Sequence, residues 1–165
     1  QFLTRVEDPD GVDFEALREA DADDDPPLLP DADPDVVKAR GFETGQHYAA
    51  LVEISVGSVN PSFRTTVTID EWDFPAGGAS GQGEASGSSF EMNSRMSITE
   101  HDDGVDIEWG AEADVFGRIA KMGQRVINPV ANRVVNRFFG NMEEQLTAVA
   151  DEDSDGLRDR IRGMF

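Results

Sequence analysis

The sequence predicts an α+β protein in which a curved antiparallel sheet packs around a long C-terminal helix. Two observations carry this prediction: apolar residues alternate with polar ones in several segments between residues 47 and 115, and the spacing then changes to that of a helix. A third is an acidic, proline-rich stretch before residue 42 that shows neither period. A chain of 165 residues is long enough to bury one hydrophobic core, so we expect one domain.

The charge of the chain is strongly unbalanced. Asp and Glu number 34 against 14 Lys and Arg, which gives a formal net charge of -20, and only Lys38 and Lys121 are lysines. This composition is typical of a halophilic, archaeon-like source, where salt screens the repulsion between hydrated carboxylates. We expect no nucleic acid partner, because phosphate binding needs a basic surface.

The residue content also excludes several chemistries. The chain has no cysteine, so it forms no disulfide, thiolate nucleophile or cysteine-ligated metal site. No apolar run is long enough to span a bilayer, and the first residues do not form a secretion signal. We therefore expect a cytoplasmic protein.

Four segments organise the chain. Residues 1–8 are expected to start a strand, 9–41 to form an acidic flexible insertion, 42–150 to form the main domain, and 151–165 to form an acidic linker with a short amphipathic tail. The insertion contains "DADDDPP" and "LLPDADPDVV", which cannot bury enough apolar surface to offset the entropy of ordering. Short apolar pieces such as Phe14 with Leu17 are expected only to dock locally.

The main domain begins with strands. Residues 74–89, "FPAGGASGQGEASGSS", fit a weak strand or a loop, and the other four runs alternate clearly. The alternation predicts an antiparallel meander of about five strands with one apolar face. The residues expected on that face are Tyr48, Ala50, Val52, Ile54, Phe63, Thr65, Val67, Ile69, Phe90, Met92, Ser94, Met96, Ile98, Val105, Ile107, Trp109, Ala111, Ala113 and Val115.

A long amphipathic helix follows the strands. We expect Pro129 to bend it and its apolar stripe to cross the concave face of the sheet. The basic residues lie mostly off the stripe, where they face anionic lipid, an acidic partner or, as we predict, the protein's own carboxylates. The stripe comprises Ile119, Gly123, Val126, Val130, Val134, Phe138, Met142 and Leu146, and the basic residues are Arg118, Lys121, Arg125, Arg133 and Arg137.

The last strands and this helix resemble a known family. "FGRIAKMGQRVINPVANRVVNRFFGNMEEQL" is similar to the glycine-initiated helix that ends the CoxG subunit of carbon monoxide dehydrogenase, in the START-like (SRPBCC, Bet v 1-like) superfamily. The matching positions are Gly117, Ala120, Gly123, Arg125, Phe138 and Phe139. "YAALVEISVGSVNPSFRTTVTIDEWDFP" resembles the family's paired strands around a "VG" turn, so the resemblance covers roughly residues 42 to 146.

One departure from the family concerns the start of the chain. The family begins with a strand and two short helices that have no counterpart before Gln1, and "FLTRVED" resembles the start of its second strand, interrupted here by the acidic insertion. We expect either a truncated sequence or a partner that fills the gap.

The resemblance implies a helix-grip fold with an apolar cavity between sheet and helix. It also implies a non-catalytic protein that binds a lipophilic quinone or isoprenoid lipid and recruits a carbon monoxide dehydrogenase-like molybdenum hydroxylase to the inner face of the cytoplasmic membrane. No other cofactor and no metal is expected. The alternative for the same side chains is that they simply pack as core. The expected ligand-binding residues are Phe90, Met92, Met96, Trp109, Val126, Val130 and Val134.

The C-terminal segment carries a second prediction. "GLRDRIRGMF" places apolar residues at helical spacing with arginines between them, which is typical of a weak membrane or partner anchor, although a frayed terminus is the alternative. The contact residues are Leu157, Arg158, Arg160, Ile161, Arg162, Met164 and Phe165. "DEDSDGLRDRIR" also partly matches a calcium loop, but Arg162 stands where the bidentate Glu belongs, so we do not expect calcium.

Catalytic motifs are missing from the sequence. His47 and His101 lie far apart and no nucleophile arrangement surrounds them. An enzyme of the cyclase or dehydratase type remains an alternative within the superfamily, with Asp73 or Glu84 as the pocket acid. A structural adaptor without a ligand is the third hypothesis.

Overall fold

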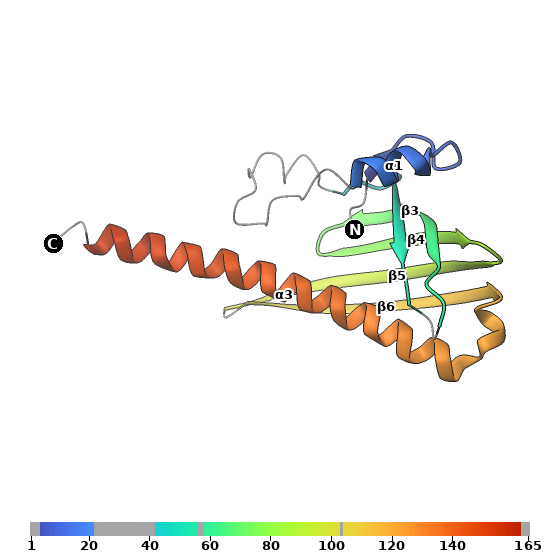
Figure 1. The fold of residues 1–165 in the computed structure, drawn as a ribbon. Helices are drawn as coiled ribbons and strands as arrows, with labels where there is room; N and C mark the ends of the chain where they lie inside the picture. The colour runs from blue at the N-terminus through green and yellow to red at the C-terminus, as the bar shows by residue number, and fades with distance from the viewer. Residues whose placement is uncertain (1–3, 22–41, 56–57, 103, 163–165) are drawn as a thin grey trace. The chain divides into compact units, whose positions relative to one another are not determined.

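The structure is a computed structural model that describes residues 4–21, 42–55, 58–102 and 104–162 (Figure 1). The chain divides into two compact units, residues 1–24 with 42–130, and residues 25–41 with 131–165. The described part of the first unit holds the sheet, one short helix and the first turns of the C-terminal helix.

The described strands form one antiparallel sheet in which neighbours in sequence are neighbours in space. Its order is β1-β2-β3-β4-β5-β6, as the predicted meander requires. The glycine-rich segment is a full strand, β4, and the short β1 adds one strand at the edge. The bounds are β1 Thr4–Val6, β2 His47–Glu53, β3 Ser62–Asp73, β4 Ala76–Ala85, β5 Ser88–His101 and β6 Gly104–Gly117.

The register of the strands keeps the predicted apolar set on one face. Tyr48 lies opposite Val67, and Met96 lies opposite Trp109, as the alternation requires. We call this face, which carries Phe63, the inner face, and the other the outer face. β3 has a bulge between Ile69 and Glu71, after which Trp72 takes the inner-face position opposite Gly77.

The core lies at the end of the sheet where β6 leads into the C-terminal helix. Phe63 and Ile119 are buried at its centre, with 3% and 8% of their surface exposed. Apolar residues from the sheet and from the first two turns of the helix surround them: Val52, Ile54, Ala85, Phe90, Val115, Val126, Ile127 and Val130.

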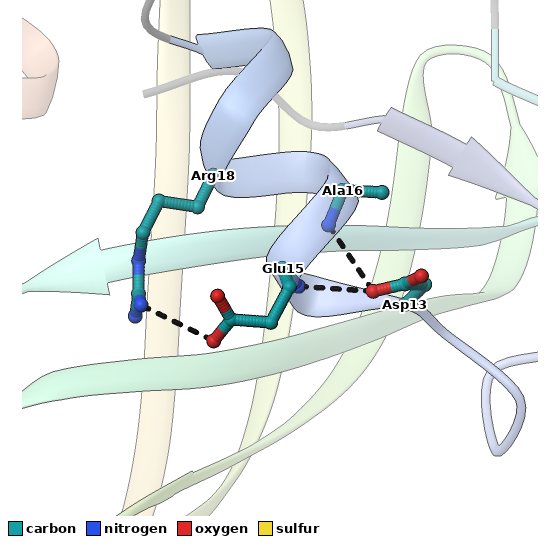
Figure 2. A network of polar contacts seen from close by, with 4 residues as sticks. All are labelled: Asp13, Glu15, Ala16 and Arg18. Carbon is teal, nitrogen blue, oxygen red and sulfur yellow. Dashed lines mark hydrogen bonds and ion pairs between the residues drawn. The ribbon is translucent and has the colours of Figure 1, made fainter.

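Residues 14–21 correct the prediction of a wholly flexible insertion. They form a helix, α1 (Phe14–Asp21), whose first turn is capped by Asp13. The Asp13 Oδ1 atom accepts hydrogen bonds from the backbone N–H of Glu15 and of Ala16, both at 3.1 Å, and Arg18 pairs with Glu15 at 3.3 Å (Figure 2). An N-cap aspartate is the sequence signal for this helix. Residues 22–41 lie outside the described part of the chain.

The outer face is also covered where β2 and β3 pair. Ala49 is fully buried and Thr66, predicted to face outward, is only 9% exposed. The helix α1 packs against β2, and Pro9 lies beside Thr66 and Thr68. Thr66 therefore faces the N-terminal segment rather than open solvent, which alternation alone did not reveal.

The turn from β6 into the helix begins with two close glycines. Gly117, with a φ of 80°, crosses the backbone of Gly87 so closely that a Cβ atom would collide with it. A short 3-10 turn, η2 (Ala120–Met122), and Gly123 follow. The long helix, α3 (Gln124–Arg162), therefore begins at Gln124 rather than at Gly117.

The helix α3 continues through the segment that we predicted as an acidic linker and separate tail. Residues 151–162 have helical backbone, continuous with the preceding turns. Pro129 lies within the helix, near its start. Residues 163–165, and the side chains beyond residue 147, lie outside the part of the chain that is described.

Candidate functional site

The inner face is built from rows of residues that run across the strands. One row, at the core end, joins Thr65 to Gly83 and then to Phe90 and Val115. A Cβ atom at Gly83 would overlap the ring of Phe90, so the absence of a side chain there makes room for the aromatic ring. The Phe90 ring contacts the Phe63 ring edge to face, with centroids 5.3 Å apart.

The core end of the inner face is closed by the start of α3. Val126 and Val130 pack against the cluster centred on Phe63 and Ile119, and the Ile119 N–H donates a hydrogen bond of 3.2 Å to the Ser88 Oγ atom. Three predicted ligand-binding residues, Phe90, Val126 and Val130, thus pack in or around the core in this structure. Their assignment to a ligand stays a prediction.

The middle of the inner face has a small-residue floor next to a methionine. Gly81 lies between Val67 on β3 and Met92 on β5, and a Cβ atom at Gly81 would lie 3.5 Å from the Met92 methyl group. On β6 the position opposite Met92 is Ala113, which is exposed. Small residues on both sides of Met92 leave its side chain few large neighbours from the sheet.

Two tryptophans mark the end of the inner face away from the core. Trp72 stands over Gly77, where a Cβ atom would lie 2.6 Å from the Trp72 ring. Met96 connects this position to Trp109, which is 38% exposed. The register therefore places Met92, Met96 and Trp109 on one apolar surface, and that surface becomes more exposed toward β6.

The last predicted ligand-binding residue lies elsewhere. Val134 belongs to the second compact unit, and its side chain is 45% exposed. The predicted set therefore comprises three residues at the core, three on the exposed half of the inner face, and Val134 outside the first unit.

A buried polar network at the start of β2 was missed by the sequence analysis. The Tyr48 hydroxyl donates to the Gln46 Oε1 atom at 2.6 Å, and the Gln46 Nε2 donates to the Glu43 carboxylate at 3.0 Å. Gln46 is 7% exposed and Tyr48 6%. Phe42 contacts both Tyr48 and Trp72 edge to face. Alternation placed Tyr48 correctly, but nothing in the pattern marked a buried glutamine.

The two carboxylates suggested for an enzyme do not lie on the inner face. Glu84 lies on the outer face, next to Arg64 at 4.0 Å, with 75% of its side chain exposed. Asp73 ends β3 opposite Ala76 and is also exposed. The hypothesis of a pocket acid at either position is therefore wrong.

Both histidines make ordinary strand contacts. His47 Nδ1 lies 2.9 Å from the Thr68 hydroxyl on the outer face, and His101 Nε2 lies 2.8 Å from the Asp106 carboxylate near the β5–β6 turn. Among the described residues, His, Asp and Glu side chains form no cluster of three or more that could hold a metal ion.

The outer face carries a polar groove that the sequence did not predict. Its volume is about 750 Å³, and Arg95 lies in its floor between Gly78 and Gly110 on the neighbouring strands. Charged residues of both signs line it, including Glu71, Glu108 and Glu112. Its polar lining sets it apart from the inner face.

The C-terminal contact residues are not described at the level of side chains. Leu157, Arg158, Arg160, Ile161 and Arg162 lie on the helical backbone of α3, and Met164 and Phe165 lie outside the described residues. No helix in the described ranges is both long and apolar enough to cross a membrane.

An antiparallel meander whose last strand leads into a long helix, with an apolar inner face, is consistent with a helix-grip α+β protein. The sequence profile of CoxG, the CoxG subunit of carbon monoxide dehydrogenase, matches residues 39–147. The match spans more than half of the chain, and the chain belongs to the CoxG family.

Solved structures support the fold. The chain is similar to a conserved protein from Geobacillus kaustophilus, with 19% sequence identity and a TM-score of 0.57. The alignment covers 62% of this chain and 68% of that one, and at this identity it shows the fold alone. No curated protein matches the chain significantly.

Proposed function

We propose that the protein is a non-catalytic accessory protein that binds a lipophilic, quinone- or isoprenoid-like molecule on its inner face. Membership of the CoxG family supports an accessory role beside a carbon monoxide dehydrogenase-type molybdenum hydroxylase. The observation that carries the ligand proposal is the difference between the two halves of the inner face. One half is filled by core side chains, and the other presents Met92, Met96 and Trp109 above small residues.

The chemistry of the exposed half suits an apolar ligand. Methionine side chains are flexible and polarisable, so they adapt to chains of irregular shape, and tryptophan offers a large flat surface. The floor beneath them is glycine and alanine, which leaves space that larger residues would fill. Carboxylates of β5 and β6 beside this surface, such as Glu91 and Asp114, lie on the outer face.

The membrane part of the proposal concerns the end of the chain. The segment from Leu157 to Phe165 alternates apolar and basic residues at helical spacing, which is typical of a weak interfacial anchor. In this proposal it holds the protein at the inner face of the cell membrane while the inner face of the sheet carries the ligand. Deleting residues 151–165 should abolish vesicle binding; unchanged binding would exclude the anchor role.

The ligand proposal is tested by mass spectrometry of small molecules extracted from the full chain, purified in high salt. Ala113→Trp fills the space opposite Met92 and should remove the bound lipid. Asp114→Trp is the matched control, because it places the same side chain on the outer face of the same strand. We expect lipid in the native chain and in the control only.

Other results would favour the alternatives. A native chain without lipid that still co-purifies with a hydroxylase would indicate a structural adaptor. Equal lipid content in both tryptophan variants would place any ligand elsewhere than on β6. The enzyme hypothesis has no observation in its favour after Asp73 and Glu84 were located away from the inner face.

A further inference from the structure

One stretch of the chain has a charge opposite to the rest. The chain carries 34 Asp and Glu, yet none lies between Asp114 and Glu143, where five basic residues occur. Its first part closes β6, forms η2 and starts α3. This part belongs to the same compact unit as the sheet.

The basic residues of this first part are not neutralised by the protein. We expected them to pair with the chain's own carboxylates, and this expectation was wrong. Arg118, Lys121 and Arg125 are exposed and make no ion pair within the described part of the chain. Each of them keeps its charge available to an external anion.

The backbone that carries these charges is fixed by the core. The Arg118 N–H donates to the Gly87 carbonyl at 2.8 Å, and the stem of its side chain lies against Gly87. Ile119, buried in the core, anchors the next residue, and the Met122 N–H closes a turn onto the Ile119 carbonyl at 3.0 Å. The charged side chains therefore project from an ordered corner where the chain turns from β6 into α3 (Figure 1).

Apolar side chains accompany the charges. Phe116 is 48% exposed and Met122 is 37% exposed, although both are large hydrophobic residues. We name the set of Phe116, Arg118, Lys121, Met122 and Arg125 the corner patch. Exposed aromatic and apolar side chains among unpaired cations are typical of surfaces that contact the interface of an anionic bilayer.

We propose that the corner patch docks on an anionic membrane surface, with its cations on lipid phosphates and Phe116 and Met122 in the headgroup region. Charge complementarity supports this occupant, because the carboxylates that make the rest of the chain acidic are repelled by such a surface. The patch is therefore the part of the first unit that approaches the bilayer. This inference rests on the proposed membrane role and adds to it a contact surface distinct from the C-terminal tail.

The test compares two double variants of the full chain that change the net charge equally. Lys121→Gln with Arg125→Gln removes two cations from the patch, and Arg64→Gln with Arg95→Gln removes two from the outer face. Binding to phosphatidylcholine vesicles containing phosphatidylglycerol is measured by flotation at moderate salt. We expect the patch variant to bind roughly thirty-fold more weakly, since each cation near the surface contributes about 1 kcal/mol. The outer-face variant should bind within about two-fold of the native chain.

Further variants separate the patch from the tail and from the ligand. Phe116→Ser with Met122→Ser should weaken binding at every salt concentration, because it removes the apolar contribution. Deleting residues 151–165 from each double variant shows whether the patch still discriminates without the tail. Lipid content by mass spectrometry should not change in the patch variants, so a failure of the patch is distinguishable from a failure of the ligand proposal.

Several outcomes would overturn the inference. Equal losses in the two charge variants would show that only net charge matters. Equal binding to vesicles of phosphatidylcholine alone would exclude recognition of anionic lipid. Binding of the patch to an acidic protein but not to vesicles would assign it to a protein partner. Circular dichroism and thermal unfolding of each variant confirm that the fold is intact.

Discussion

The two sides of the sheet differ in how they are covered. β2 and β3 are buried on both faces, since Tyr48 and Thr65 on the inner face and Ala49 and Thr66 on the outer face each have 9% or less of their surface exposed. β6 is exposed on both faces over most of its length, and Trp109 remains 38% exposed. Strand pairing is continuous across both regions, so pairing alone does not determine which region is core.

This difference separates stability from contact. The side with β2 and β3, together with the corner that holds Ile119, contributes most of the apolar burial in the described unit. β6 is held chiefly by its pairing with β5 and presents its side chains to solvent. A substitution on the first side should change folding, and one on β6 should change binding.

The largest test of this comparison removes one aromatic ring from each region of the inner face. Phe63→Ala should lower the free energy of unfolding by about 3–5 kcal/mol, because Phe63 is 3% exposed and packs against the Phe90 ring. Trp109→Ala should cost about 1 kcal/mol, because its ring is already partly in water. Urea unfolding at fixed salt measures both, and equal losses would refute the division of roles.

A second test adds a methyl group instead of removing a ring. Gly83→Ala forces a Cβ atom into the Phe90 ring and should destabilise the fold by about 1–3 kcal/mol. Gly110→Ala, on β6, meets nothing within 4 Å and should be neutral or slightly stabilising, because glycine is unfavourable within a strand. Thermal unfolding distinguishes the two, and a destabilised Gly110→Ala variant would mean that β6 is covered after all.

A smaller effect is expected from single hydrogen bonds. Tyr48→Phe removes the donor to the Gln46 Oε1 atom, which still accepts from the Glu43 N–H at 3.1 Å, so we expect a loss of about 1 kcal/mol. His101→Gln removes the exposed contact with Asp106 and should change stability by less than about 0.5 kcal/mol. Chemical denaturation resolves this difference, and a larger loss at His101 would contradict the solvent-exposed character of that turn.

The sequence predicted the faces of the sheet well, because a strand has one period and each residue is assigned by parity. It also predicted that the Phe63 and Phe90 strands meet the apolar stripe of the helix at Val126 and Val130, which the core confirms. Both results follow from the local repeat and need no knowledge of distant contacts.

What covers each face was beyond the reach of periodicity. Thr66 reads as an outward residue, and it is buried because segments far away in sequence cover β2 and β3. Gln46 is buried because its amide is satisfied by Glu43 and Tyr48, an arrangement no alternation marks. The helix start was placed too early because Gly117 and Gly123 both fit a glycine-initiated pattern, and the crossing with Gly87 decides between them.

The smallest predicted effect concerns the exposed side of the sheet alone. Glu91 on β5 lies directly opposite Asp114 on β6, and both are exposed on the outer face. Like charges directly opposite each other destabilise an antiparallel pair, so Glu91→Gln should stabilise the protein by a few tenths of a kcal/mol at low salt. The gain should vanish as salt rises, because exposed charges at this separation are screened.

Glu84→Gln is the matched control for this repulsion, since Glu84 is exposed on the neighbouring strand but faces Arg64 instead of a carboxylate. It should give no gain at any salt concentration. Unfolding free energies measured over a salt series compare the two variants. A Glu91→Gln gain that persists at high salt would show that packing rather than charge limits the pairing of β5 with β6, and the weakness of the exposed side of the sheet would then come from poor side-chain contact.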